Sequence, residues 1–269
     1  MTTMPHTPDT ENDDLTPLLG EPFARAWAAP VTPATRDGLG QRLAGRLQAS
    51  LEAERGMVTV RRRHQLGQAP IDGVLHRELY RAPASRALRP GEPRLASVVE
   101  LAAGARITLP AGGVREFLVV QGSVEVDGEF LGERDFLLLP AGFAVHLSST
   151  EGGQVFVREA DGDLPERHLV RDAEAGWPEF APGIRRRVLW AADGQASLLY
   201  QTDPGASVPV HRHGHDEECL MVEGELFLDD LLLQQGDYQL APAGSGHRIT
   251  ETESGVILYA HGDLDLQFT

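Results

Sequence analysis

Short apolar runs separated by turn-forming residues dominate the chain from about residue 57 onward. Such runs lie within residues 73–80, 94–101, 116–122, 135–142 and 154–160, and Gly, Pro or Asp residues separate them. A new run about every ten residues, with turn signals between runs, is typical of an all-β sandwich or barrel. We therefore predict that residues 57–269 form antiparallel β-sheets.

A different pattern precedes these strands. Leu39, Leu43, Leu47 and Leu51 recur every four residues, which places them on one face of a helix. Residues 1–14 are polar and acidic, so we expect a disordered tail there, followed by a helical extension over residues 15–56. The leucine stripe either packs against the chain's own β-domains or docks another protein.

The strand-rich part contains an internal repeat. The segment EFLVVQGSVEVDG from Glu116 resembles ECLMVEGELFLDD from Glu218, at an offset of 102 residues (218 − 116 = 102). DFLLLPAG recurs as DYQLAPAG at the same offset. Because a constant offset across several motifs indicates duplication, we predict two β-domains, residues 57–165 and residues 166–269.

Composition excludes several classes of function. The sequence has 24 Lys and Arg against 40 Asp and Glu, a formal net charge of −16, which argues against nucleic acid or an anionic membrane surface as a partner. A single cysteine, Cys219, excludes an intrachain disulfide framework and a cysteine-rich zinc or iron–sulfur site. The sequence shows neither signal-peptide features nor an apolar run long enough to span a membrane, so we expect a cytoplasmic protein.

The second repeat contains the residue types of a metal centre. His211 and His213 are two positions apart on a predicted strand, so both side chains point to the same face. Glu217 follows after a tight turn, and His247 comes from a later strand. Three imidazoles and one carboxylate suit a divalent ion, Zn or Fe above all and also Mn, Co or Ni, and they leave coordination positions open. We predict one divalent metal ion, held by these four residues.

The same residues match both sequence motifs of the cupin superfamily. The motif G-x5-H-x-H-x3-E-x6-G fits residues 205–224 without a gap, and G-x5-P-x-G-x2-H-x3-N fits residues 236–251 except that Glu251 replaces the asparagine. The resemblance implies a bicupin, with two antiparallel jelly-roll barrels in tandem behind the helical extension. Glu251 has the strand parity of His247, so we expect it either to face the metal, as a general base or supporting carboxylate, or to lie at the barrel rim.

The first repeat lacks most of these ligands. Pro110 and Gly112 stand at the positions of the two H-x-H histidines, whereas Glu116 and His146 remain. Because two side chains rarely hold a metal ion against water, we expect the barrel at residues 57–165 to bind no metal. Its predicted role is structural, as a substitute within one chain for the partner barrel of a cupin dimer.

Three further stretches resemble the ChrR-type cupins: residues 58–61 (VTVR), 183–189 and 211–225. This group includes the cupin half of zinc-dependent anti-sigma factors, so the resemblance implies a regulatory or sensor module. Those anti-sigma factors hold the sigma factor through an N-terminal H-x3-C-x2-C zinc site. Since the sequence contains no such cysteines, we do not expect a sigma factor as a partner.

A second function stays open at this point. Cupins with three His and one Glu also include Fe(II)-dependent dioxygenases, and the resemblance therefore also fits an enzyme that acts on a small diketone-, flavonol- or aryl-ketone-like substrate. A small-molecule ligand is compatible with either function, and so is a homodimer. Cys219 shares the strand face of Glu217 and is either a thiol beside the metal or a small buried apolar residue.

Overall fold

The computed structural model describes residues 40–42, 44–45, 48, 51–52, 55–163 and 166–268. The chain divides into two compact units, Met1–Gln48 and Ala49–Thr269. All described residues from 40 to 55 are helical, as predicted for the extension, and Leu51 among them is exposed. The other three leucines of the stripe and the predicted acidic tail lie outside the described residues. No helix in the described ranges is long and apolar enough to cross a membrane.

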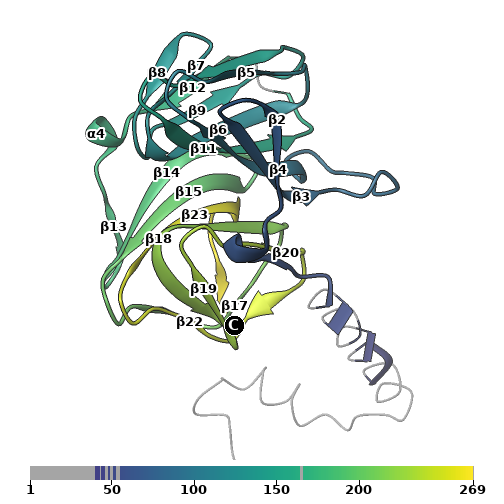
Figure 1. Ribbon diagram of the computed structural model, residues 1–269. Coiled ribbons are helices and arrows are strands. Elements are labelled where there is room, and N and C mark those ends of the chain that lie inside the picture. Colours follow the sequence, from purple (N-terminus) through teal and green to yellow (C-terminus); the bar gives the residue numbers. More distant parts are fainter. Residues whose placement is uncertain are drawn as a thin grey trace, which may run out of the picture. The chain divides into compact units, whose positions relative to one another are not determined.

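The first barrel consists of two antiparallel sheets (Figure 1). The larger sheet has the strand order β12-β9-β6-β11-β4-β3-β2 and the smaller has the order β5-β10-β7-β8. These strands are β2 (Gly67–Ile71), β3 (Val74–Arg81), β4 (Pro93–Leu101), β5 (Arg106–Leu109), β6 (Val114–Gly122), β7 (Val124–Val126), β8 (Glu129–Leu131), β9 (Phe136–Leu139), β10 (Val145–Ser148), β11 (Gly153–Ala160) and β12 (His168–Val170). The helical turn η1 (Arg62–His64) precedes them, and the backbone N–H of its Arg62 donates to Asp237 of the second barrel at 2.7 Å.

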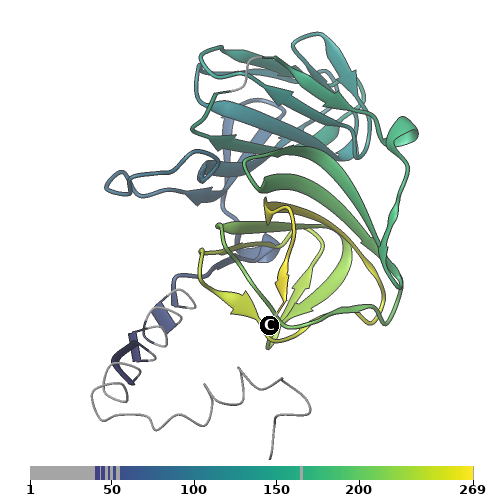
Figure 2. The same cartoon turned by 180° about the vertical axis from the view of Figure 1, so that it is seen from behind.

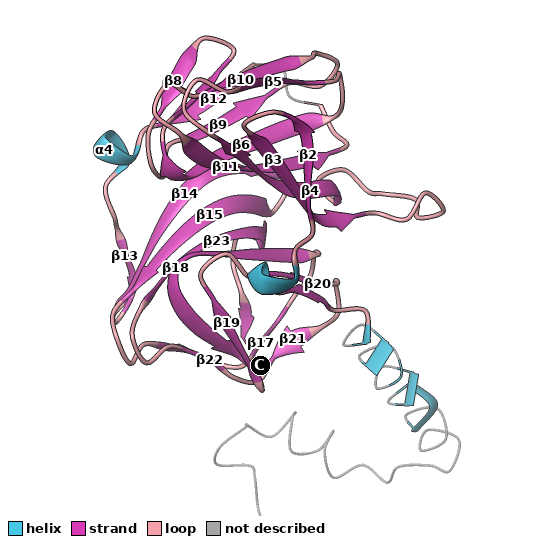
Figure 3. Cartoon of the chain, viewed as in Figure 1, coloured by secondary structure: helices cyan, strands magenta, loops and turns pink. Residues whose placement is uncertain are grey.

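The second barrel repeats this plan. Its larger sheet has the order β1-β20-β18-β23-β15-β14-β13, with β16, β19 and β22 attached, and its smaller sheet has the order β21-β17-β24. These elements are β1 (Val58–Val60), α4 (Asp172–Ala175), β13 (Glu179–Ala181), β14 (Ile184–Ala192), β15 (Gln195–Thr202), β16 (Ser207–Val208), β17 (His211–Arg212), β18 (Glu217–Leu228), β19 (Leu231–Gln234), β20 (Tyr238–Ala241), β21 (Gly246–His247), β22 (Thr250–Glu251), β23 (Val256–Asp263) and β24 (Gln267–Phe268). The all-β prediction, two antiparallel jelly rolls in tandem, is confirmed (Figure 3).

Each barrel gives one edge strand to the other, which the predicted boundaries missed. β1 pairs with β20 of the second barrel, and β12 pairs with β9 of the first. An arginine follows each exchanged strand and binds an aspartate of the receiving barrel: Arg61 lies 2.9 Å from Asp237, and Arg171 lies 2.8 Å from Asp135. Residues 58–60, which the prediction assigned to the first domain, therefore belong to the second barrel. Residues 168–170, which the prediction assigned to the second domain, belong to the first barrel.

The duplication is also visible in the backbone. Gly122 and Gly224 are 102 residues apart (224 − 122 = 102) and have φ values of 68° and 74°. A Cβ added at either position would lie 2.5 Å from the carbonyl oxygen of Gly152 or 2.1 Å from that of Gly255. Because both sites combine a positive φ with a close backbone approach, each requires glycine. The same turn is thus kept in both barrels.

Strand alternation divides the apolar side chains between the barrel interiors and the junction between the barrels. The first interior holds Val74, Val99, Leu101, Phe117, Val119, Val124, Val126, Leu131, Leu137, Val145, Leu147, Val155 and Val157, and the second holds Cys219, Met221, Leu226, Leu228, Leu233, Val256, Leu258 and Ala260. The junction core draws on both repeats, including Phe156, which packs against Tyr259 with ring centroids 5.0 Å apart. Figure 2 shows the large sheets of the two barrels running side by side at this junction.

A buried ion-pair network crosses the apolar junction. Arg158 on β11 donates to Glu116 on β6 at 2.9 Å and also to Glu218 on β18, and these three side chains are at most 4% exposed. The hydroxyl groups of Tyr259 and Tyr238 donate to the two carboxylates, each at 2.7 Å. Such a network is stabilising only while every charge keeps its partners.

Ionised Glu116 makes the free energy of unfolding depend on pH in the acidic range. Burial alone would raise the pKa of this carboxyl, but the charge of Arg158 and the hydrogen bonds at the carboxylate, including that from Ser197, hold the pKa well below its ordinary value of 4.5. A depressed folded-state pKa adds stability that is present above the unfolded pKa and is lost as the pH falls below it. We expect the difference in unfolding free energy between wild type and Glu116→Gln, measured in urea, to be largest at about pH 6 and to shrink toward about pH 3. A difference that does not change with pH would contradict an ionised Glu116.

Candidate metal centre

Two short strands and the start of a long strand bring the predicted ligands together at one end of the second barrel. His211 on β17 is paired with His247 on β21. His213 directly follows β17, and its backbone N–H donates to the carbonyl oxygen of Ser245 at 3.0 Å. Glu217 is the first residue of β18. Strand pairing therefore brings together residues that are far apart in the sequence.

The four side chains of His211, His213, Glu217 and His247, here called the metal cluster, are packed against one another. The centroids of the three imidazole rings are between 5.1 and 5.7 Å apart, and each histidine is at most 3% exposed. Oε2 of Glu217 lies 3.3 Å from Nδ1 of His213 and 3.9 Å from Nε2 of His247. Ligand atoms of His211, His213 and Glu217 lie within 4.8 Å of one another, close enough for one ion to bridge them.

Hydrogen bonds orient two of the rings. Nδ1 of His211 lies 3.0 Å from the carbonyl oxygen of Pro209, so Nδ1 carries the proton and donates it. Nδ1 of His247 lies 3.1 Å from Oδ2 of Asp229. In both rings this leaves Nε2 free to bind an ion, because the partner fixes the tautomer.

Asp229 is a functional residue that the sequence analysis missed. Burial would raise the pKa of its carboxyl, but hydrogen bonds from His247 and from the backbone N–H of Arg248 hold the pKa below its ordinary value. The repeat contained a signal, because Asp127 lies 102 residues earlier (229 − 127 = 102) and contacts His146 at the same distance of 3.1 Å. An aspartate retained beside a histidine in both repeats indicates a positioning pair.

Unpartnered nitrogen atoms show that the metal cluster fits an ion. In the described part of the chain, Nε2 of His213 and Nε2 of His247 are buried and have no hydrogen-bond partner. Burying polar atoms in this state is costly unless they coordinate a metal or bind water. Neutral imidazole and carboxylate are ligands of Zn, Fe, Mn, Co and Ni. The chemistry of the residues present therefore fits a divalent metal ion.

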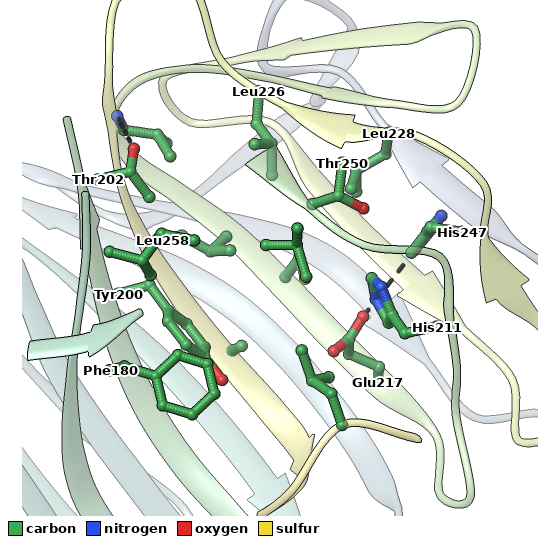
Figure 4. Close-up of a pocket in the computed structure, with 16 residues that line it drawn as sticks. Phe180, Tyr200, Thr202, His211, Glu217, Leu226, Leu228, His247, Thr250 and Leu258 are labelled. Carbon is green, nitrogen blue, oxygen red and sulfur yellow. Dashed lines mark hydrogen bonds and ion pairs between the residues drawn. The ribbon is translucent and has the colours of Figure 1, made fainter. Parts of the chain in front are cut away.

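An apolar cavity extends from the metal cluster into the barrel (Figure 4). His211, Glu217 and His247 lie at one end, and apolar side chains such as Leu226 and Leu258 form most of the remaining wall. The space open to the centres of water-sized molecules is about 60 Å³, which is room for about four waters. The space beside the metal cluster is therefore small.

Few polar groups reach this cavity. Oγ1 of Thr250 is buried without a hydrogen-bond partner among the described residues, and it lies on the His247 side of the cavity (Figure 4). Burial raises the pKa of Tyr200 to about 12, so its hydroxyl is neutral. Burial also raises the pKa of Cys219 well above its usual value, and this buried thiol both belongs to the apolar interior and lines the cavity.

Glu251 does not join the metal cluster. It is exposed and does not line the cavity, whereas its neighbour Thr250 does. β21 ends at His247 and β22 begins at Thr250, so strand alternation does not run continuously between them. The expectation that Glu251 faces the metal does not hold, and Glu251 lies at the rim instead.

Glu116 and His146, the two residues of the first barrel with metal-ligand chemistry, lie apart from each other. His146 keeps its contact with Asp127, but its side chain is 72% exposed. Glu116 faces the junction and binds Arg158, so it is the counterpart of Glu218, and it does not correspond to a metal ligand. The prediction that this barrel binds no metal stays a prediction.

Comparison with known proteins gives the same architecture. Residues 165–265 match the family model of the ChrR Cupin-like domain. Similar solved structures include a candidate dioxygenase from Nostoc punctiforme PCC 73102, at 14% identity over 77% of this chain and 83% of that chain with a TM-score of 0.60. Others are a Cupin 2 conserved barrel domain protein from Leptotrichia buccalis (15%, 76% and 95%, TM-score 0.53) and a mutant of Bacillus subtilis oxalate decarboxylase (16%, 79% and 78%, TM-score 0.58). These identities establish the fold alone. No curated protein matches the sequence.

Proposed function

We propose that this chain, a two-barrel cupin with a ChrR Cupin-like domain at residues 165–265, is a regulatory module that binds one divalent metal ion, Zn²⁺ or Fe²⁺, together with a small molecule. The observation that carries the proposal is the small apolar cavity that ends on the metal cluster. A confined site with four protein ligands suits the retention of an ion and the recognition of one small ligand. The match to the ChrR Cupin-like domain supports a regulatory role.

The residues around the ion have separate tasks. The metal cluster holds the ion, which supplies a Lewis-acidic centre for an oxygen of the ligand when it is bound. Asp229 keeps the imidazole of His247 in the tautomer that binds metal. Thr250 offers its unpaired hydroxyl to a polar atom of the ligand, and Leu226 and Leu258 exclude water around the apolar part.

A second candidate function is an Fe(II)-dependent dioxygenase. The unpaired Thr250 hydroxyl beside the metal cluster favours it, because such a group can orient a substrate oxygen. The cavity of about 60 Å³ restricts this candidate to a small diketone, since a flavonol is too large for it. Glu251, at the rim, is not placed to accept a proton from a substrate in the cavity.

Metal content and oxygen uptake distinguish the two functions. We expect the purified protein to carry about one metal ion per chain. With acetylacetone as the probe, Fe²⁺-loaded wild type should consume oxygen no faster than the His211→Ala variant. Uptake that depends on acetylacetone and disappears in His211→Ala would overturn the regulatory proposal in favour of the enzyme.

A further inference from the structure

A second cavity lies at the junction between the two barrels and shares no lining residue with the cavity of the metal cluster. The space open to the centres of water-sized molecules is about 310 Å³, in the size range of small-molecule sites. Strands β6, β9 and β11 of the first barrel and β14, β15 and β23 of the second contribute to its wall. Val114, Leu138 and Trp190 make much of this wall apolar, while Glu116, Arg158 and His261 bring buried polar groups to it.

The hydrogen bonds around His261 determine which ring nitrogen carries the proton. Oγ of Ser197 donates to Oε2 of Glu116 at 2.6 Å, because an ionised carboxylate can only accept. The same Oγ lies 2.9 Å from Nδ1 of His261, and since its own hydrogen is already donated, it accepts from Nδ1–H. The neutral ring therefore presents Nε2 as an acceptor.

No described residue donates a hydrogen bond to this Nε2 atom. His261 is 1% exposed, and its Nε2 is buried without a hydrogen-bond partner among the described residues. The ring lines the junction cavity, so a ligand there can supply the missing donor. An unsatisfied buried acceptor costs free energy, which a ligand with an N–H or O–H group would recover.

Charges around the cavity favour a cation. Glu116 and Arg158 of the buried network line the cavity, and the same guanidinium also pairs with Glu218, so the network holds two carboxylates against one guanidinium. At the rim, Asp161 pairs with Arg94 at 2.9 Å, but Asp163 and Asp193 are exposed and have no ion-pair partner in the described ranges. A positive ligand would be attracted by these carboxylates, and a negative ligand would be repelled.

We propose that the junction cavity is a binding site for a small organic ammonium ion with an apolar body. The ammonium group donates to Nε2 of His261 and offsets the excess of carboxylates. The apolar body packs against Leu138 and Trp190, and the indole ring adds a favourable surface for a cation. This site is independent of the metal and is distinct from the proposed function of the second barrel.

Three matched probes test this site: benzylammonium, benzyl alcohol and benzoate, titrated into the full chain and followed by calorimetry and ligand-observed NMR. We expect benzylammonium to bind at one site, at least about tenfold more tightly than the alcohol, and benzoate to show no binding. Binding should weaken as salt is added, because rim charges are screened. Benzoate binding as tightly as benzylammonium would overturn the proposal.

Variants identify the residues involved. His261→Gln keeps a donor toward Ser197 and should weaken benzylammonium binding about tenfold. Because His261 is buried and its variant can fail to fold, the double variant Asp163→Asn/Asp193→Asn provides a second test at exposed positions, and Asn tolerates the φ of 52° at position 193. It should weaken binding severalfold.

The matched control is Asp230→Asn, which removes a charge from a side chain that is 92% exposed and lies outside the cavity. It should bind benzylammonium like wild type, and so should His211→Ala/His213→Ala, since the junction site needs no metal. Equal weakening in Asp230→Asn, unchanged binding in the rim variant, or loss of binding in the double histidine variant would each contradict the junction site.

Discussion

Replacing Arg158 with methionine should lower the free energy of unfolding by about 3–5 kcal/mol. Arg158 is the cation that holds Glu116 and Glu218 at the junction, and all three side chains are buried. Methionine keeps much of the volume but leaves two carboxylates without a counter-charge in an apolar environment. Equilibrium unfolding in urea, followed by fluorescence and circular dichroism, measures the loss.

An exposed ion pair provides the control for this variant. Arg81 pairs with Glu78 at 2.5 Å, but the two side chains are 58% and 42% exposed. Arg81→Met should therefore cost less than about 1 kcal/mol, because a solvated pair contributes little. Equal losses in Arg158→Met and Arg81→Met would mean that the buried network does not stabilise the junction.

The variant His211→Ala/His213→Ala should reduce the bound metal from about one ion per chain to none. Only His247 and Glu217 would remain, and two ligands cannot replace the hydration shell of the ion. Elemental analysis of the purified proteins, after dialysis against metal-free buffer, gives the stoichiometry.

The first barrel offers a matched control for metal loss. His146 is the counterpart of His247 and keeps the equivalent contact with an aspartate, but it is exposed. His146→Ala should retain the full metal content. Metal that survives in the double variant, or a ratio near two in wild type, would place an ion outside the metal cluster.

The four residues of the metal cluster were predictable as neighbours because the signal in the sequence is local. His211 and His213 share a strand face by alternation, and the spacing to Glu217 and His247 follows a motif that strand pairing closes in the structure. The duplication was equally accessible, since a constant offset needs no knowledge of packing. For the same reason the all-β fold followed from the spacing of apolar runs.

Features that depend on pairing between distant strands were not predictable. β1 pairs with β20, and β12 pairs with β9, and the sequence does not reveal either pairing. Glu116 resembled a metal ligand in the sequence. Its pairing with Arg158 depends on the register between two strands, which the sequence does not give. The direction of the Glu251 side chain was inferred by counting alternate residues from His247. This count fails because β21 ends at His247 and a new strand, β22, begins at Thr250.

Several expectations stay predictions. A cytoplasmic location, a homodimer and the absence of a sigma-factor partner concern the protein's surroundings rather than its fold. The leucine stripe lies mostly outside the described residues, so its two alternatives, packing within the chain or docking of another protein, also stand as predicted.

X-ray absorption spectroscopy at the edge of the bound metal tests the central claim, that three imidazoles and one carboxylate of the second barrel hold a single ion. For zinc, we predict a first shell of nitrogen and oxygen at about 2.0–2.1 Å, with the outer-shell scattering of three imidazole rings. A sulfur contribution at about 2.3 Å would make Cys219 a ligand. That result, or scattering from fewer imidazoles in wild type, would contradict the metal cluster described by the structure.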